Sequence, residues 1–133
     1  MRRLLATLIA AAGLLPPLGA IAQSATPRLL VMDLPYARVW EGTLRALDGY
    51  TLTRASDGVI ETARVERAPL PDEVGLDRVA ERITVRVEAV GDRITRVTVM
   101  VEAEALRAGS WRAVEASPNT TRTVLDHIRA GIG

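Results

Sequence analysis

The sequence contains no cysteine and no lysine, and His127 is its single histidine. Without cysteine the chain forms no disulfide, and it cannot carry the lipid that bacterial-type lipoproteins attach to a cysteine at their cleavage point. A lone histidine acts as a catalytic base only beside a nucleophile or a carboxylate. No metal-ligand spacing of histidine, cysteine and carboxylates is present. The sequence therefore favours a protein without catalytic residues, metal or cofactor, whose stability comes from one packed core.

An excess of charge of one sign is also missing. The 17 basic residues are all arginine, and they face 16 acidic residues. Removal of an amino-terminal leader that carries Arg2 and Arg3 leaves 15 arginines and a net charge of about −1. Such a balance provides no field that attracts nucleic acid or an anionic membrane. We therefore expect neither among the partners of this protein.

The first 22 residues have the pattern of a cleavable signal peptide. Arg2 and Arg3 precede an apolar run from Leu4 to Leu15, and Ala20-Ile21-Ala22 supplies small residues at the cleavage point. The run is shorter than the roughly 20 apolar residues that a membrane-spanning helix needs. We expect cleavage after Ala22 and a periplasmic or secreted protein with a single α+β domain over residues 23–133. An uncleaved anchor is the alternative.

Two segments have the periodicity of amphipathic helices. From Tyr36 to Asp48 the apolar residues recur at spacings of three and four, and Gly49 lies where a left-handed cap belongs. Ser117 and Pro118 are typical of the cap and first position of a final helix. The apolar stripe expected on that helix consists of Thr121, Val124, Leu125, Ile128 and Ile132.

Four segments have strand character: residues 50–54, 59–66, 78–90 and 94–105. The first two are joined by the turn Ser56-Asp57-Gly58. Residues 28–32 (RLLVM) are a fifth strand or an extended arm, and residues 110–115 are ambiguous. The order of elements predicts an α+β, helix-grip-like fold. In it an antiparallel sheet of four or five strands carries the N- and C-terminal helices on one face.

The hairpin of the two long strands has a register that both of its faces specify. A three-residue loop, Gly91-Asp92-Arg93, sets Val87 against Val97 on the buried face and Glu88 against Arg96 on the wet face. A two-residue loop at Gly91-Asp92 would instead oppose Val87 and Arg96. The sequence therefore predicts the three-residue loop.

The stretch VWEGTLRALDGYTLTRASDGVIET, residues 39–62, joins an aromatic-bearing helix to a charged turn and a hydrophobic strand. With Trp40, Gly49-Tyr50 and Gly58-Val59-Ile60 at its key positions, the region of about residues 36–66 resembles the helix-grip repeats of the outer-membrane-assembly lipoprotein C family. The resemblance implies binding surfaces that contribute to an envelope assembly and no catalytic residues. The missing lipidation cysteine is a departure from that family.

Two carboxylates share the phase of apolar neighbours on their strands. Glu81 follows the phase of Val79 and Ile83, and Glu61 follows the phase of Val59. Two partly buried carboxylates could perform acid–base chemistry in a hydrolase-type enzyme. The alternative, which we favour, places each at an edge position paired with an arginine.

The wet face of the long hairpin is the remaining candidate site. Arg86, Arg96 and Met100 lie on it, and Met100 is an apolar residue among charges. Trp111 is the best single anchor for a protein partner, because tryptophan dominates binding hot spots. A lid over the open end of the core is its other interpretation.

These features favour an exported, non-catalytic scaffold or protein-interaction module with an envelope protein as its partner. The alternative is a periplasmic protein that binds a small apolar ligand between helix and sheet. That alternative requires a cavity between Trp40, Leu47 and Val85, whereas a filled core favours the interaction module.

Overall fold

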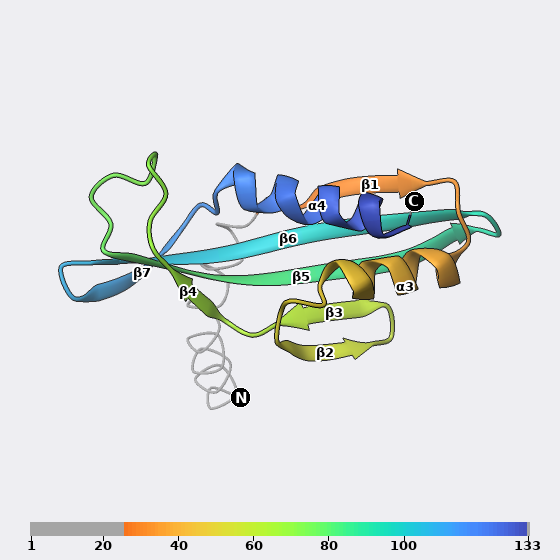
Figure 1. The fold of residues 1–133 in the computed structure, drawn as a ribbon, viewed down its shortest axis with the longest axis horizontal. Coiled ribbons are helices and arrows are strands. Elements are labelled where there is room, and N and C mark those ends of the chain that lie inside the picture. Colours follow the sequence, from red (N-terminus) through yellow and green to blue (C-terminus); the bar gives the residue numbers. More distant parts are fainter. Residues whose placement is uncertain (1–25, 133) are drawn as a thin grey trace, which may run out of the picture.

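The computed structural model describes residues 26–132 (Figure 1). The predicted signal peptide lies outside these residues. The elements, labelled as in Figure 1, are β1 (Arg28–Met32), α3 (Tyr36–Ala46), β2 (Leu52–Ser56), β3 (Val59–Thr62), β4 (Val65–Arg67), β5 (Arg78–Gly91), β6 (Ile94–Arg107), β7 (Ser110–Val114) and α4 (Pro118–Ile132).

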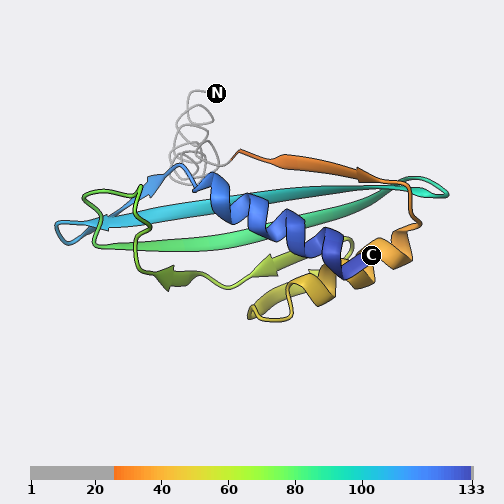
Figure 2. The same ribbon diagram turned by 45° about the horizontal axis from the view of Figure 1, so that its top comes forward.

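The seven strands form one antiparallel sheet in the order β1-β6-β5-β3-β2, with β4 paired to β5 and β7 paired to β6. The long β5–β6 hairpin runs through its middle, and both helices lie on the same face, with α4 crossing over the sheet toward α3 (Figure 2). The predicted α+β, helix-grip-like fold is therefore confirmed. We call the face turned away from the helices the outer face.

The predicted count of four or five strands is wrong. Residues 28–32 belong to the sheet, because β1 pairs with β6 over five consecutive residues. The ambiguous segment around Trp111 forms β7. The predicted strand over residues 59–66 is interrupted after Thr62, so that β3 and β4 pair with different parts of β5.

The predicted hairpin register is confirmed on both faces. Val87 lies opposite Val97, and Glu88 lies opposite Arg96. The three-residue loop itself is wrong in detail: Gly91 pairs with Ile94, and the register shifts between Ala89 and Gly91. A bulge thus takes up the extra residue, which keeps each side chain on its predicted face.

The core lies between the sheet and the two helices. Val39 and Leu47 from the α3 region meet Val85 of β5 in it, and each of the three is at most 1% exposed. The predicted stripe of α4 is also confirmed, since Thr121, Val124, Ile128 and Ile132 are buried and Leu125 packs against the cluster. Full burial of each such aliphatic side chain stabilises the fold by about 1.5–3 kcal/mol.

The helices touch at two glycines, Gly42 and Gly131. A Cβ atom at Gly42 would clash with the side chain of Ile132, and one at Gly131 would lie 2.9 Å from the carbonyl oxygen of Gly42. Arg45 donates a hydrogen bond of 2.8 Å to the Gly131 carbonyl oxygen near the end of α4. Glycine at both positions therefore permits the close approach of α3 and α4.

The predicted left-handed cap at Gly49 is wrong. Helix α3 ends at Ala46, and the positive φ angles of the described chain lie elsewhere, among them 53° at Asp57 and 75° at Gly58. The backbone N–H of Tyr50 donates to the Leu47 carbonyl at 3.0 Å, which closes this end with an ordinary turn. The turn predicted between residues 56 and 58 is confirmed by its two left-handed residues.

Candidate interaction surface

Strand β1 lies at one edge of the sheet (Figure 2). Two of its large apolar side chains are exposed to solvent. Leu30 and Met32 pack against the core, whereas Leu29 and Val31 are 65% and 63% exposed. Because side chains alternate along a strand, these last two project from the outer face. An edge strand also offers unpaired backbone N–H and C=O groups to a further strand.

Three of the four predicted interaction residues adjoin this edge. Leu29 lies opposite Thr98 and Val31 lies opposite Arg96 on β6. On the other side of β6, Thr98 faces Arg86 of β5. Met100, which is half-buried, follows on the same face of β6. The structure thus brings these three predicted residues together with Leu29, Val31 and Thr98. We call the set Leu29, Val31, Arg86, Arg96, Thr98 and Met100 the outer patch.

Within the outer patch the charge of Arg96 is moderated by an ion pair. Arg96 donates to Glu88 at 3.2 Å, and both side chains are about two-fifths exposed. An exposed pair of this kind contributes about 0–1 kcal/mol to stability and presents little net charge to a partner. The outer patch therefore offers a partner the exposed apolar side chains of Leu29 and Val31 together with the exposed side chain of Arg86.

Sequence reasoning missed Leu29 and Val31 because the run RLLVM shows no alternation of apolar and polar residues. Both sides of β1 are apolar, although only one side faces the core. The available signal was the apolar run of residues 29–32, which is typical of a strand buried on both faces.

Trp111 does not join the outer patch. It lies on β7 opposite Leu106, at the other end of β6, and the guanidinium carbon of Arg64 is 4.4 Å from the centre of its ring. Arg64 is itself held by Glu104 at 3.1 Å and by Glu66 at 3.4 Å. One face of the predicted anchor is therefore covered within the chain. Trp111 is not a lid on the core either, because Leu106 and Trp111 belong to the outer face.

Glu61 and Glu81, the two carboxylates in the phase of apolar neighbours, lie on opposite faces of the sheet. Glu61 pairs with Thr84 on the outer face and approaches Arg54 at 3.9 Å. Glu81 pairs with Val65 and Ala103 on the helix face. The pair needed for hydrolase-type acid–base chemistry is therefore not assembled. Each carboxylate has the arginine partner that we favoured, but the predicted edge positions are wrong, because β3 and β5 both have neighbouring strands on two sides.

Glu81 belongs to a network that fastens the loop between β4 and β5. Arg67 donates to Glu73 at 2.7 and 3.0 Å and to Glu81 at 3.0 and 3.2 Å. The Thr120 hydroxyl of α4 donates to Glu81 at 2.9 Å. The hydrogen bonds from Arg67 hold the pKa of Glu73 below its usual range, and the hydrogen bonds that Arg67 donates to Glu73 and Glu81 raise the pKa of Arg67 itself. Arg67 also donates to the Ala68 carbonyl. Because its N–H groups bond to partners within the chain, we assign the network a structural role.

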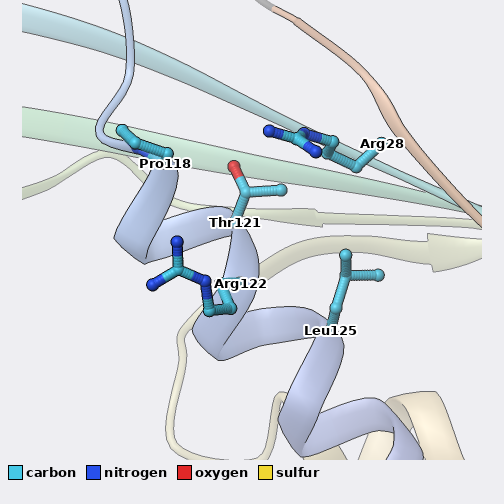
Figure 3. A pocket seen from close by; sticks show the side chains of 5 residues that line it. All are labelled: Arg28, Pro118, Thr121, Arg122 and Leu125. Carbon is cyan, nitrogen blue, oxygen red and sulfur yellow. The ribbon is translucent and has the colours of Figure 1, made fainter.

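Three clefts of the described chain are small, and each has a charged side chain in its wall. Two of about 180 and 270 Å³ adjoin this network and share Tyr50, Arg67 and Glu81. A third, of about 130 Å³, separates β1 from α4; Figure 3 shows Arg28 reaching over Thr121 there, with Arg122 on the helix. None of the three lies between Trp40, Leu47 and Val85, where the core is filled by Leu47 and Val85 with Trp40 packed against them.

The remaining candidates for chemistry are dispersed. His127 is exposed on α4. Within residues 26–132, no group of three or more His, Asp or Glu residues could hold a metal ion. No helix in the same range is long and apolar enough to cross a membrane.

Comparison with known proteins finds solved structures that are similar to this chain at low sequence identity. No family model matches the chain, and no curated protein matches it. A solved structure of a Nitrosospira multiformis protein is 17% identical, with 82% of this chain and 96% of that one covered and a TM-score of 0.43. Ara h 8.0201 is 10% identical over 81% and 96% of the two chains, with a TM-score of 0.40. The aromatase/cyclase di-domain protein BexL is 14% identical over 81% and 43%, with a TM-score of 0.35. The resemblance to the outer-membrane-assembly lipoprotein C family stays a prediction.

Proposed function

We propose that this protein is an exported, non-catalytic interaction module of the cell envelope, which binds a protein partner through the outer patch and the β1 edge. The observation that carries this proposal is the exposure of Leu29 and Val31, 65% and 63%, on an edge strand. A strand added beside β1 would use its free backbone groups, and the two side chains would supply apolar contact. Export to the envelope rests on the predicted signal peptide.

The close packing of the core supports the same proposal. A protein that binds a small apolar ligand needs an apolar cavity of about 300–1,000 Å³. The clefts beside Tyr50 are smaller, and they are bordered by the charged side chains of Arg67 and Glu81. The filled core between α3 and the sheet therefore favours a role that uses the outside of the molecule.

Cross-linking and pull-down from envelope extract test the proposal. The bait is the chain from residue 23 with a carboxyl-terminal tag, compared with its Val31→Arg and Val74→Arg variants. Val74 lies in the loop before β5 and is 81% exposed, so Val74→Arg places the same charge elsewhere. We expect Val31→Arg to lose the captured partner and Val74→Arg to retain it. Equal capture by all three baits would contradict the proposal.

A further inference from the structure

We propose that the strand added beside β1 belongs to a second copy of this chain, related to the first by a two-fold axis through Leu30. This inference rests on the proposed function, because it names a partner for the same surface. It would convert two seven-stranded sheets into one continuous sheet, with all four helices on one side.

The residues of β1 are complementary to themselves in an antiparallel pair. With Leu30 opposite its own copy, Leu29 lies opposite Val31 of the second copy, and Val31 lies opposite Leu29. Both cross-strand pairs are apolar and lie on the outer face, where these side chains are now in solvent. On the helix face the central pair is Leu30 with Leu30. A two-fold axis permits such a match because each copy presents the same patch.

The charges at the ends of β1 select the same orientation. Arg28 is the first residue of the strand, and Asp33 directly follows its last residue. In this register Arg28 of each copy lies opposite Met32 of the other and one position from its Asp33, so that the strand ends bring unlike charges near each other, whereas parallel pairing would bring like charges together. Pro27 has no N–H to donate, so the pairing stops at the ends of the five-residue strand.

The predicted processing of the chain leaves β1 uncovered. Cleavage after Ala22 leaves only residues 23–25 ahead of Thr26. Three residues span about 10 Å when extended, which is too short to return and pair along β1. The amino-terminal segment of the mature chain is therefore not the occupant of this edge.

A five-residue strand pair is a small interface. Stable complexes bury about 1,600 Å² in total, and two short strands with two apolar pairs bury less. We therefore expect a dimer that depends on concentration and dissociates on dilution. Such a dimer closes on itself, because the axis uses up the β1 edge of both copies.

The absence of cysteine permits a direct test of the register by disulfide formation. We would prepare the chain from residue 23 with Leu29→Cys, with Val31→Cys, and with Ala55→Cys on the opposite edge as a control. The register places residue 29 beside residue 31 of the second copy, at a distance that a disulfide can span, and separates identical positions by a diagonal. Under mild oxidation we expect the mixture of Leu29→Cys and Val31→Cys to cross-link at least about tenfold faster than Ala55→Cys and faster than either alone.

Sedimentation of the wild-type chain gives the second readout. From about 10 µM to about 1 mM, a range that covers weak complexes, the average mass should rise toward that of a dimer. Val31→Arg should remain monomeric and Val74→Arg should behave as the wild type. A wild-type monomer throughout this range, or cross-linking no faster than in Ala55→Cys, would overturn the inference.

The experiments distinguish failure of the second-copy inference from failure of the proposed envelope function. If the chain stays monomeric while Val31→Arg still abolishes capture of an envelope protein, the second copy is wrong and the interaction module stands. If the dimer forms with the expected register while Val31→Arg captures envelope proteins like the wild type, the inference stands and the envelope partner is wrong.

Discussion

The two edges of the sheet differ in how they are protected. Strand β1 pairs with β6 through five regular positions and carries a charge only at Arg28, its first residue. Strand β2, at the other edge, has a register shift between Leu52 and Arg54, and Arg54 approaches Asp57 at 4.0 Å. A bulge and a central charge are the devices by which proteins discourage pairing at an edge. The β2 edge therefore has the features of a surface that avoids partners, whereas the β1 edge lacks them.

The difference follows from how each strand is built into the fold. Strand β2 is joined to β3 by the tight turn at Asp57 and Gly58, so its pairing is local and tolerates an irregular register. Strand β1 pairs with a segment more than sixty residues away, and its inner side must fill the core beside α4. An apolar run satisfies that inner side and leaves Leu29 and Val31 exposed on the other. The two edges thus differ in apolar exposure and in regularity, and these two properties distinguish the proposed interaction surface at β1 from the β2 edge.

The largest expected effect is destabilisation of the whole fold, because unfolding of the sheet removes both of its edges. Gly42→Ala places a methyl group against Ile132 at the crossing of α3 and α4, and overpacking of this kind costs about 1–3 kcal/mol. We expect a lower melting temperature and, above it, loss of all binding. The control is Gly49→Ala, because a Cβ atom there meets nothing within 4 Å. Equal melting of the two variants would contradict the close helix contact.

Val31→Arg should impair association at the β1 edge while the sheet stays folded. Because Val31 is 63% exposed, the free energy of unfolding should change by no more than about 0.5 kcal/mol. Self-association should weaken at least about tenfold, since an arginine would be placed in the apolar cross-strand pair. Sedimentation and thermal melting of the same samples measure both. A large fall in stability would show that Val31 belongs to the core.

Acidification should weaken the fold while leaving the contrast between the edges unchanged. Hydrogen bonds from Arg67 lower the pKa of Glu73 below its ordinary value of 4.5. Because the folded-state pKa is the lower one, this stabilisation is present above about pH 4.5 and is lost as the pH falls through the folded-state pKa. We expect a falling melting temperature in that window, with a shallower fall in Glu73→Gln. An identical pH dependence in both proteins would contradict the role of the pair.

Removing the charge from β2 should increase only slightly the tendency of that edge to pair with another strand. Arg54→Val deletes the central charge, but the register shift beside it remains. We expect self-association to increase by less than about threefold, because the irregular backbone still opposes a regular partner strand. A strong increase in average mass on sedimentation would show that charge alone protects this edge.

The smallest effect is expected at the only histidine. His127 is exposed on α4, so His127→Ala should change stability by less than about 0.5 kcal/mol and leave capture of a partner unchanged. A folded His127→Ala protein that lost all biological activity would overturn the non-catalytic proposal.

Much of the fold was predictable, and the parts that were not share one cause. The stripe of α4 and the pairing of Val87 with Val97 follow from periodicity within one helix or one hairpin, where neighbours in space are near in sequence. The break after Thr62 and the cap at Gly49 were missed because they depend on which part of β5 and which turn of α3 the chain meets.

For the candidate site, the features that the sequence determined and those that the tertiary structure decided are more clearly distinct. Alternation along β5 and β6 by itself determined that Arg86, Arg96 and Met100 share the outer face. Only the tertiary structure decided that Leu29 and Val31 adjoin them, that Arg64 covers Trp111, and that Glu61 and Glu81 lie on opposite faces. The physical reason is that side-chain direction is a local property of a strand. Which strands become neighbours is settled by burial of the whole apolar surface at once.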